Sequence, residues 1–63
     1  MRYPRLRAKR VELGLRQEDM ANRLGITLAT YSLKESGKRE FVASEILQIL
    51  NILNSKFEDI FLN

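Results

Sequence analysis

The residues of this chain that could do chemistry are mainly its cations, and they are gathered at one end. Residues 1–39 hold ten of the eleven Lys and Arg side chains and only four acids, whereas residues 40–63 hold one Lys and four acids. The net charge is +3. Because Lys and Arg bind phosphate oxygens, this distribution is typical of a protein whose front half touches a polyanion. The apolar, acidic back half is suited to packing.

The same sequence has little that could support catalysis. It contains no His and no Cys, which excludes disulfides and a zinc site of the Cys/His type. Its acids are scattered, and no Gly-rich phosphate loop occurs. We therefore expect a binding protein and not an enzyme, with no cofactor and no small-molecule substrate. No apolar run approaches the roughly 20 residues that span a bilayer, so we expect a cytoplasmic protein without a membrane partner.

Three short helices are predicted in the basic half. Apolar residues at helical spacing, with a Pro in the first turn, predict a helix over about 4–13. A second helix is predicted over 17–24 and a third over about 28–36. Only residues 25–27 separate these two, and the last of them, Thr27, is a good N-cap. Two helices at a steep angle across a short Gly-containing turn form a helix-turn-helix.

Two further helices are predicted in the acidic half. One runs from about residue 43 or 44 to 53 and is apolar over more than half of its circumference. The other is expected to begin with a capping box between Ser55 and Glu58 and to end near residue 61 or 62. No segment shows the alternation of a strand. The sequence therefore predicts a single all-α domain over residues 1–63, with a thin stability margin.

A resemblance to a known family runs through most of these residues. Its first part is the segment Leu6-Arg-Ala-Lys-Arg-Val-Glu-Leu-Gly-Leu-Arg-Gln-Glu-Asp-Met-Ala-Asn-Arg-Leu-Gly-Ile-Thr27, which resembles the start of a Cro/CI-type (XRE family) helix-turn-helix domain. Glu35-Ser-Gly-Lys38 resembles the family's exit from its third helix, and Ser55-Lys-Phe-Glu-Asp-Ile-Phe61 resembles its closing turn. The pattern from Tyr31 to Phe41 further resembles small regulators of phages and prophages of Gram-positive bacteria.

This resemblance implies a compact five-helix bundle of the lambda-repressor-like DNA-binding type. It implies a sequence-specific regulator of transcription that binds double-stranded DNA, with the third helix in the major groove and the second across the backbone. It also implies a homodimer, at least on DNA, on a pseudo-palindromic operator with half-sites about 34 Å apart. Because the 63 residues end after the fifth predicted helix, a Cro-like phage or prophage repressor in a bacterial host is favoured. The alternative is a protein-binding module of the same fold, an antirepressor or an antitoxin component.

The polar residues of the basic half then receive expected roles. Phosphate contacts are expected from Arg16, Gln17, Thr30, Lys38 and Arg39. Arg10 and Glu35 correspond to a family pair that bridges the first and third helices, although Arg10 is also a candidate phosphate ligand. Arg16 replaces the Thr that is common in the family, so a helix cap is lost and a cation is gained.

The outward face of the predicted third helix is expected to contact bases. The residues that the resemblance places toward the groove are Thr27, Leu28, Ala29, Ser32 and Leu33. Three of these are apolar and cannot read guanine or adenine by paired hydrogen bonds, which leaves thymine methyls, hydroxyl contacts and DNA shape. Internal packing of the two leucines, or contact with a partner protein, is the alternative. Tyr31 is expected in the core, and Lys34 is expected to lay its stem over the core and its ammonium in solvent or on phosphate.

A dimer seam is predicted in the back half, because its apolar side chains exceed what one small core is expected to bury. The residues assigned to this seam are Ile49, Ile52, Ile60, Phe61 and Leu62. A monomeric core that buries all of them is the alternative.

Overall fold

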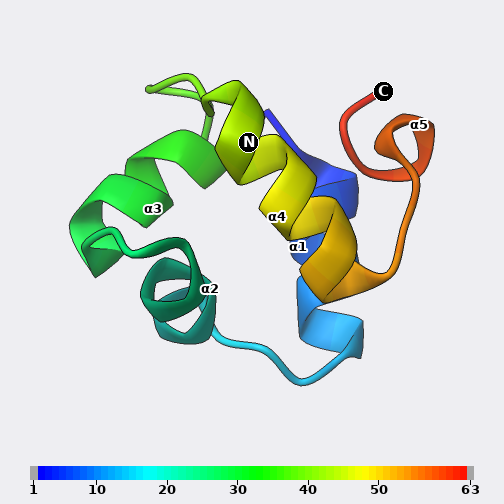
Figure 1. Ribbon diagram of the computed structural model, residues 1–63, viewed down its shortest axis with the longest axis horizontal. Coiled ribbons are helices and arrows are strands. Elements are labelled where there is room, and N and C mark those ends of the chain that lie inside the picture. Colours follow the sequence, from blue (N-terminus) through cyan, green and yellow to red (C-terminus); the bar gives the residue numbers. More distant parts are fainter. Residues whose placement is uncertain (1, 63) are drawn as a thin grey trace.

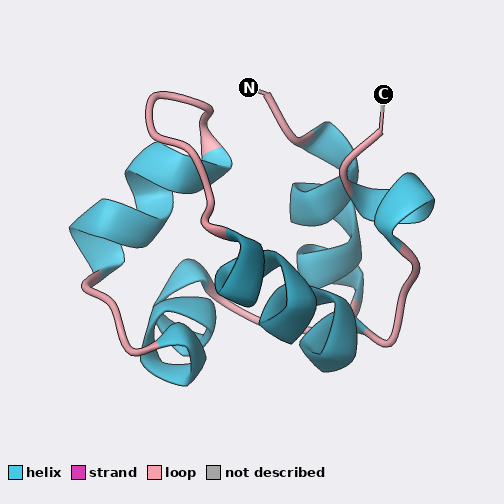
Figure 2. Cartoon of the chain, turned by 45° about the horizontal axis from the view of Figure 1, so that its top comes forward, coloured by secondary structure: helices cyan, strands magenta, loops and turns pink. Residues whose placement is uncertain are grey.

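Residues 2–62, the part of the chain that this computed structural model describes, contain five helices and no strand (Figures 1 and 2). The helices are α1 (Pro4–Glu12), α2 (Gln17–Leu24), α3 (Leu28–Glu35), α4 (Ala43–Leu53) and α5 (Phe57–Ile60). The all-α prediction is confirmed, and the bounds of the first four helices agree closely with those expected. Over the same stretch, none of the helices has the length and apolar character required to cross a membrane.

The short turn between α2 and α3 determines the shape of one side of the molecule. Gly25 takes a left-handed φ of 72°, which ends α2, and the Ile26 N–H returns to the Ala21 carbonyl at 3.0 Å. Thr27 then caps α3, since its side-chain oxygen accepts from the Thr30 N–H at 3.1 Å. As Figures 1 and 2 show, α2 and α3 form one side, α1 and α5 the other, and α4 lies between them.

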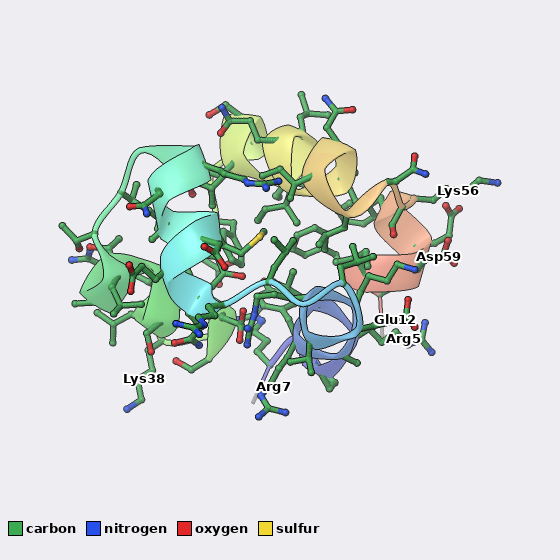
Figure 3. The ribbon with its side chains drawn as sticks, turned by 90° about the horizontal axis from the view of Figure 1, so that it is seen from below. Arg5, Arg7, Glu12, Lys38, Lys56 and Asp59 are labelled. Atoms are coloured by element: carbon green, nitrogen blue, oxygen red, sulfur yellow. The ribbon has the colours of Figure 1, made fainter. Side chains whose placement is uncertain are left out.

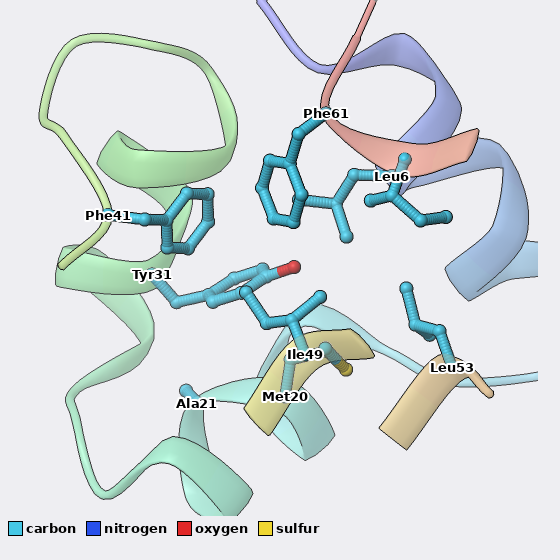
Figure 4. Packing of buried hydrophobic residues seen from close by; sticks show 9 residues of the cluster. Leu6, Met20, Ala21, Tyr31, Phe41, Ile49, Leu53 and Phe61 are labelled. Atoms are coloured by element: carbon cyan, nitrogen blue, oxygen red, sulfur yellow. The ribbon is translucent and has the colours of Figure 1, made fainter. Parts of the chain in front are cut away.

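The core is centred on Tyr31, which is fully buried as expected. Its ring lies 6.1 Å from the ring of Phe41, and Phe41 lies 5.8 Å from Phe61 (Figure 4). Such tilted and edge-on aromatic contacts add to the energy of burial alone. The buried apolar residues are Leu6, Met20, Ala21, Tyr31, Phe41, Ile49, Leu53, Ile60 and Phe61. They come from all five helices, from the loop before α4 and from Phe61 just after α5, so every helix contributes to one core.

The predicted dimer seam is wrong for three of its five residues. Ile49 is 0% exposed, Ile60 3% and Phe61 9%, so all three are core residues of one chain. The Tyr3 ring packs against Phe61, with the two ring centroids 5.3 Å apart. Ile52 is half-buried and Leu62 is 52% exposed.

The predicted capping box at Ser55 is also wrong. The Ser55 hydroxyl donates to the Leu53 carbonyl at 2.9 Å, and its backbone N–H donates to the Leu50 carbonyl at 3.0 Å. Ser55 therefore donates to carbonyls in the last turn of α4, where Asn54 is left-handed with φ 49°. Helix α5 begins only at Phe57, with Lys56 at the N-cap position and no side-chain cap.

Candidate nucleic-acid interface

Glu35, the last residue of α3, is the centre of a buried hydrogen-bond network. Its carboxylate accepts from Arg10 Nε at 3.0 Å and from Arg10 Nη2 at 3.1 Å. The Tyr31 hydroxyl donates to it at 2.6 Å and Gln17 Nε2 donates at 3.2 Å. Arg10 Nη1 donates to the Leu15 carbonyl at 2.8 Å. One carboxylate therefore joins α1, α2 and α3, and Arg10, which is 6% exposed, is the expected bridge between helices.

The protonation of this network follows from its surroundings. Burial acts to raise the pKa of Glu35, but the hydrogen bonds from Arg10, Tyr31 and Gln17 outweigh it and hold the pKa below its usual value. Burial raises the pKa of Tyr31, and the hydrogen bond to the Glu35 carboxylate raises it further. At neutral pH the site therefore holds an ionised Glu35 and a neutral phenol that donates to it.

A second buried ion pair involves Lys34 and corrects the expectation that its ammonium reaches solvent or phosphate. Lys34 Nζ donates to the two carboxylate oxygens of Glu45 at 2.6 and 2.8 Å, and the two residues are 8% and 7% exposed. Glu45 Oε1 also accepts from the Val42 N–H at 3.0 Å, at the start of α4. The sequence did contain a signal for this pair that the prediction did not use. Lys34 falls on the inward side of α3, and a buried cation requires an anionic partner.

The two pairs together fix the orientation of α3. Lys34 and Glu35 are consecutive, and they connect the end of α3 to α4 on one side and to α1 and α2 on the other. Another orientation of α3 would separate these buried charges from their partners, which is strongly destabilising. The face of α3 that carries Leu28 and Leu33 is consequently held outward.

The acid sensitivity of the fold follows from these carboxylates. The pKa values of Glu35 and Glu45 both lie below the usual 4.5, in each case because hydrogen bonds to the ionised form outweigh burial. A lowered folded-state pKa contributes stability that is present above the unfolded pKa and is lost as pH falls through the folded pKa. We expect the free energy of unfolding to be level above about pH 5.5 and to fall steadily below about pH 4.5. Urea titrations across this range measure it.

One variant tests how much of the loss of stability in acid comes from Glu45. Glu45→Gln should lower stability at neutral pH and flatten the decline in acid, because the amide does not titrate. Since the chain has no His, no histidine titration overlaps the region above pH 5. Stability that increases on acidification would contradict the assignment.

The outward face of α3 is apolar and largely open to solvent. Leu28 is 48% exposed, Leu33 is 38% exposed and Ala29 is exposed, while Ser32 is half-buried. Thr27 is exposed, but its hydroxyl oxygen caps the helix and is 2.9 Å from Thr30 Oγ1. Each leucine therefore keeps more than a third of its surface open to solvent. Of the five expected base-contacting residues, four lie on α3 and the fifth, Thr27, is its N-cap.

The loop after α3 presents exposed cations at one edge of this surface. The N–H groups of Lys38 and Arg39 donate to the Leu33 carbonyl at 2.9 and 3.2 Å, which fixes the loop to the helix. Gly37 permits the turn with φ 88°, and a Cβ at this position would lie 2.4 Å from the Cβ of Arg2. The Lys38 side chain projects away from the body of the molecule, on the same side as Arg7 (Figure 3).

The start of α2 lies at the other edge. Arg16 is exposed at the N-cap position of α2, where its N–H donates to the Asp19 carboxylate at 2.8 Å and its side chain makes no cap. Gln17 is half-buried and donates one amide hydrogen to Glu35, and its second amide hydrogen can donate to another group. Between α3 and the α1–α2 turn lies an open hollow of about 530 Å³. Sequence reasoning missed this hollow, whose apolar lining is Val11, Leu15 and Leu28.

Comparison with known families agrees with this geometry. A family model described as helix-turn-helix matches residues 6–60, which includes all five helices. No significant match to a curated protein or to a solved structure was found. The chain belongs to the helix-turn-helix family of the Cro/CI (XRE) type, a family of DNA-binding transcription regulators.

Proposed function

We propose that this protein is a sequence-specific regulator of the Cro-like kind, a phage or prophage repressor that acts in the bacterial cytoplasm. The observation that carries the proposal is the solvent-exposed outer face of α3, with exposed cations at both edges and two buried ion pairs behind it. A helix of this kind fits the major groove, while α2 lies across the backbone.

The proposed contacts divide into two sets. Phosphates are bound by Arg16, Gln17, Thr30, Lys38 and Arg39, and bases are contacted by Thr27, Leu28, Ala29, Ser32 and Leu33. Thr30 is half-buried, and in the arrangement where Thr27 donates to Thr30 Oγ1 the Thr30 hydroxyl hydrogen is free for a phosphate. Phosphate contacts set the position of the protein, and base contacts set which sequence it prefers.

We further propose that two copies bind a pseudo-palindromic operator, with half-sites about 34 Å apart. With Ile49, Ile60 and Phe61 in the core, Ile52 and Leu62 remain of the predicted seam, and we add the exposed Phe57 of α5 to them. Phe57 is 44% exposed, and its ring stacks on the Phe61 ring with the two centroids 5.4 Å apart. Sedimentation with and without operator distinguishes a free dimer from one that forms only on DNA.

Selection of bound sites from random duplex, followed by titration across salt, tests the function. Specific binding should survive competitor DNA and weaken steeply as salt rises. Lys38→Ala should weaken binding to all duplexes by a similar factor and reduce the salt slope by about 1. Lys56→Ala is the matched control, because Lys56 projects on the opposite side of the molecule and should leave both quantities unchanged (Figure 3). Equal affinity for every duplex would refute sequence-specific regulation.

The exposed leucines also favour a second candidate, a protein-binding module with the role of an antirepressor or an antitoxin component. Leu28 borders the hollow together with Val11 and Leu15, and such an apolar surface suits a protein partner. Absence of binding to any duplex at low salt would favour this candidate over the first.

A further inference from the structure

We propose that α3 reads the 5-methyl groups of pyrimidines in the major groove, and that it accepts 5-methylcytosine in place of thymine. The readers are Leu28 and Leu33, and the proposal rests on the proposed function. It specifies that the protein selects DNA sites by their pyrimidine C5 methyl groups, so that methylation of cytosine changes its affinity for a site.

The first support is the shortage of hydrogen-bonding groups on the reading face. The Thr27 oxygen accepts from the Thr30 N–H and is paired with the Thr30 hydroxyl. The Ser36 hydroxyl donates to the Leu33 carbonyl at 3.0 Å. Lys34 and Glu35 are paired inside the protein. Among the base-facing positions of α3, Ser32 alone keeps a hydroxyl for base edges, and it is half-buried.

The second support is the arrangement of the apolar groups. At about 100° per residue, Leu28 and Leu33 lie at the two edges of an arc of about 140°, with Ala29 and Ser32 between them. Five residues advance the helix by about 7.5 Å, which is about two base-pair steps. Two leucines at this separation can each meet a pyrimidine methyl at different positions of one half-site, while small residues between them allow close approach.

The third support is the charge on both sides of the apolar strip. Leu33 is joined through its carbonyl to the backbone of Lys38 and Arg39, and Leu28 borders the same hollow as Arg16 and Gln17. The leucines are therefore held between two sets of phosphate-binding groups. An apolar surface between two sets of phosphate-binding groups matches the major groove between its two phosphate backbones, so duplex DNA is the partner that we propose for Leu28 and Leu33.

The chemistry of the groove then determines which bases are accepted. Thymine presents a C5 methyl, whereas cytosine presents a bare C5–H and guanine presents two acceptors that a leucine leaves unpaired. A methyl on C5 of cytosine occupies the place of the thymine methyl. Methylation should therefore convert a poorly accepted C·G pair into a partial substitute for T·A.

The test uses the full chain and its selected operator, with the C5 methyl as the only variable. Thymines in each half-site are replaced singly by uracil, and in a second series by cytosine or by 5-methylcytosine. Loss of a contacted methyl should weaken binding about fourfold, and methylation of cytosine should strengthen it about fourfold. Leu28→Ala and Leu33→Ala should each abolish this dependence at one position and keep it at the other.

A matched control separates a direct contact from a general loss of apolar surface. Leu47 is 66% exposed on α4, so Leu47→Ala should keep the full methyl dependence. If the wild-type protein binds its operator specifically but is indifferent to uracil and to 5-methylcytosine, methyl reading is overturned and the proposed function stands. If it discriminates between no duplexes at all, the proposed function itself fails. The wild-type comparison needs no variant, so it is independent of the stability of any substitution.

Discussion

Glu35→Ala is expected to lower the free energy of unfolding by about 3–5 kcal/mol, the largest effect of any exchange outside the apolar core. The substitution leaves a buried Arg10 without its partner and removes the acceptor of Tyr31 and Gln17. A chain of this size has about 3–9 kcal/mol of stability in total. We therefore expect a large unfolded population near room temperature, measured by urea unfolding followed by circular dichroism.

Two further variants make this prediction specific. Glu58→Ala is the matched control, because Glu58 is exposed on α5 and should change stability by less than about 0.5 kcal/mol. Arg10→Met combined with Glu35→Leu should recover only part of the loss, since the Tyr31 hydroxyl and the Gln17 amide stay without an acceptor. A loss below about 1 kcal/mol for Glu35→Ala would show that the network contributes little.

The second large effect is expected at the other buried pair. Lys34→Ala leaves the Glu45 carboxylate with only the Val42 N–H as donor, in a site where both side chains are about 10% exposed or less. The expected loss is about 3 kcal/mol, because an unpaired buried charge is strongly destabilising. Urea and thermal unfolding measure it, and the exposed pair Lys9–Glu12 provides the control. Lys9→Ala should cost less than about 1 kcal/mol.

A double substitution should reverse most of that loss. Lys34→Met keeps the length of the stem, and Glu45→Gln keeps an oxygen that accepts from the Val42 N–H. With no charge left in the site, stability should return to within about 1 kcal/mol of the wild type or exceed it. If the double variant is as unstable as Lys34→Ala alone, packing of the lysine stem, and not its charge, is the larger contribution.

The helices of the basic half were predictable because their signals are local. Proline at the start of α1, the Gly25 turn and the Thr27 cap each act within a few residues. The Arg10–Glu35 bridge was expected only through resemblance to a family, since a contact across 25 positions has no local pattern. Lys34 shows the limit of such reasoning, because its partner Glu45 sits on a helix whose position relative to α3 depends on the whole core.

The back half was predicted less well for a similar reason. An apolar helix indicates that its side chains are buried, but it does not show whether they are buried by the same chain or by a second copy. The sequence therefore placed Ile49 and Phe61 at a dimer seam, whereas both are buried in the core of a single chain. The expected box at Ser55 failed because α5 begins one residue later, with Lys56 at its N-cap, while the Ser55 hydroxyl donates to the Leu53 carbonyl at the end of α4. The roles of the outward residues of α3 remain predictions, since they concern a partner that is not part of the fold.

The separation of inner and outer residues along α3 has a consequence for how such a protein can evolve. Tyr31, Lys34 and Glu35 are buried and hydrogen-bonded to each other or to other helices, whereas Leu28 is 48% exposed and Leu33 38%. Exchanges at exposed positions of this kind usually change stability by less than about 0.5 kcal/mol. A descendant of this chain can therefore acquire a new target site one residue at a time, and each intermediate on the way is still a folded protein.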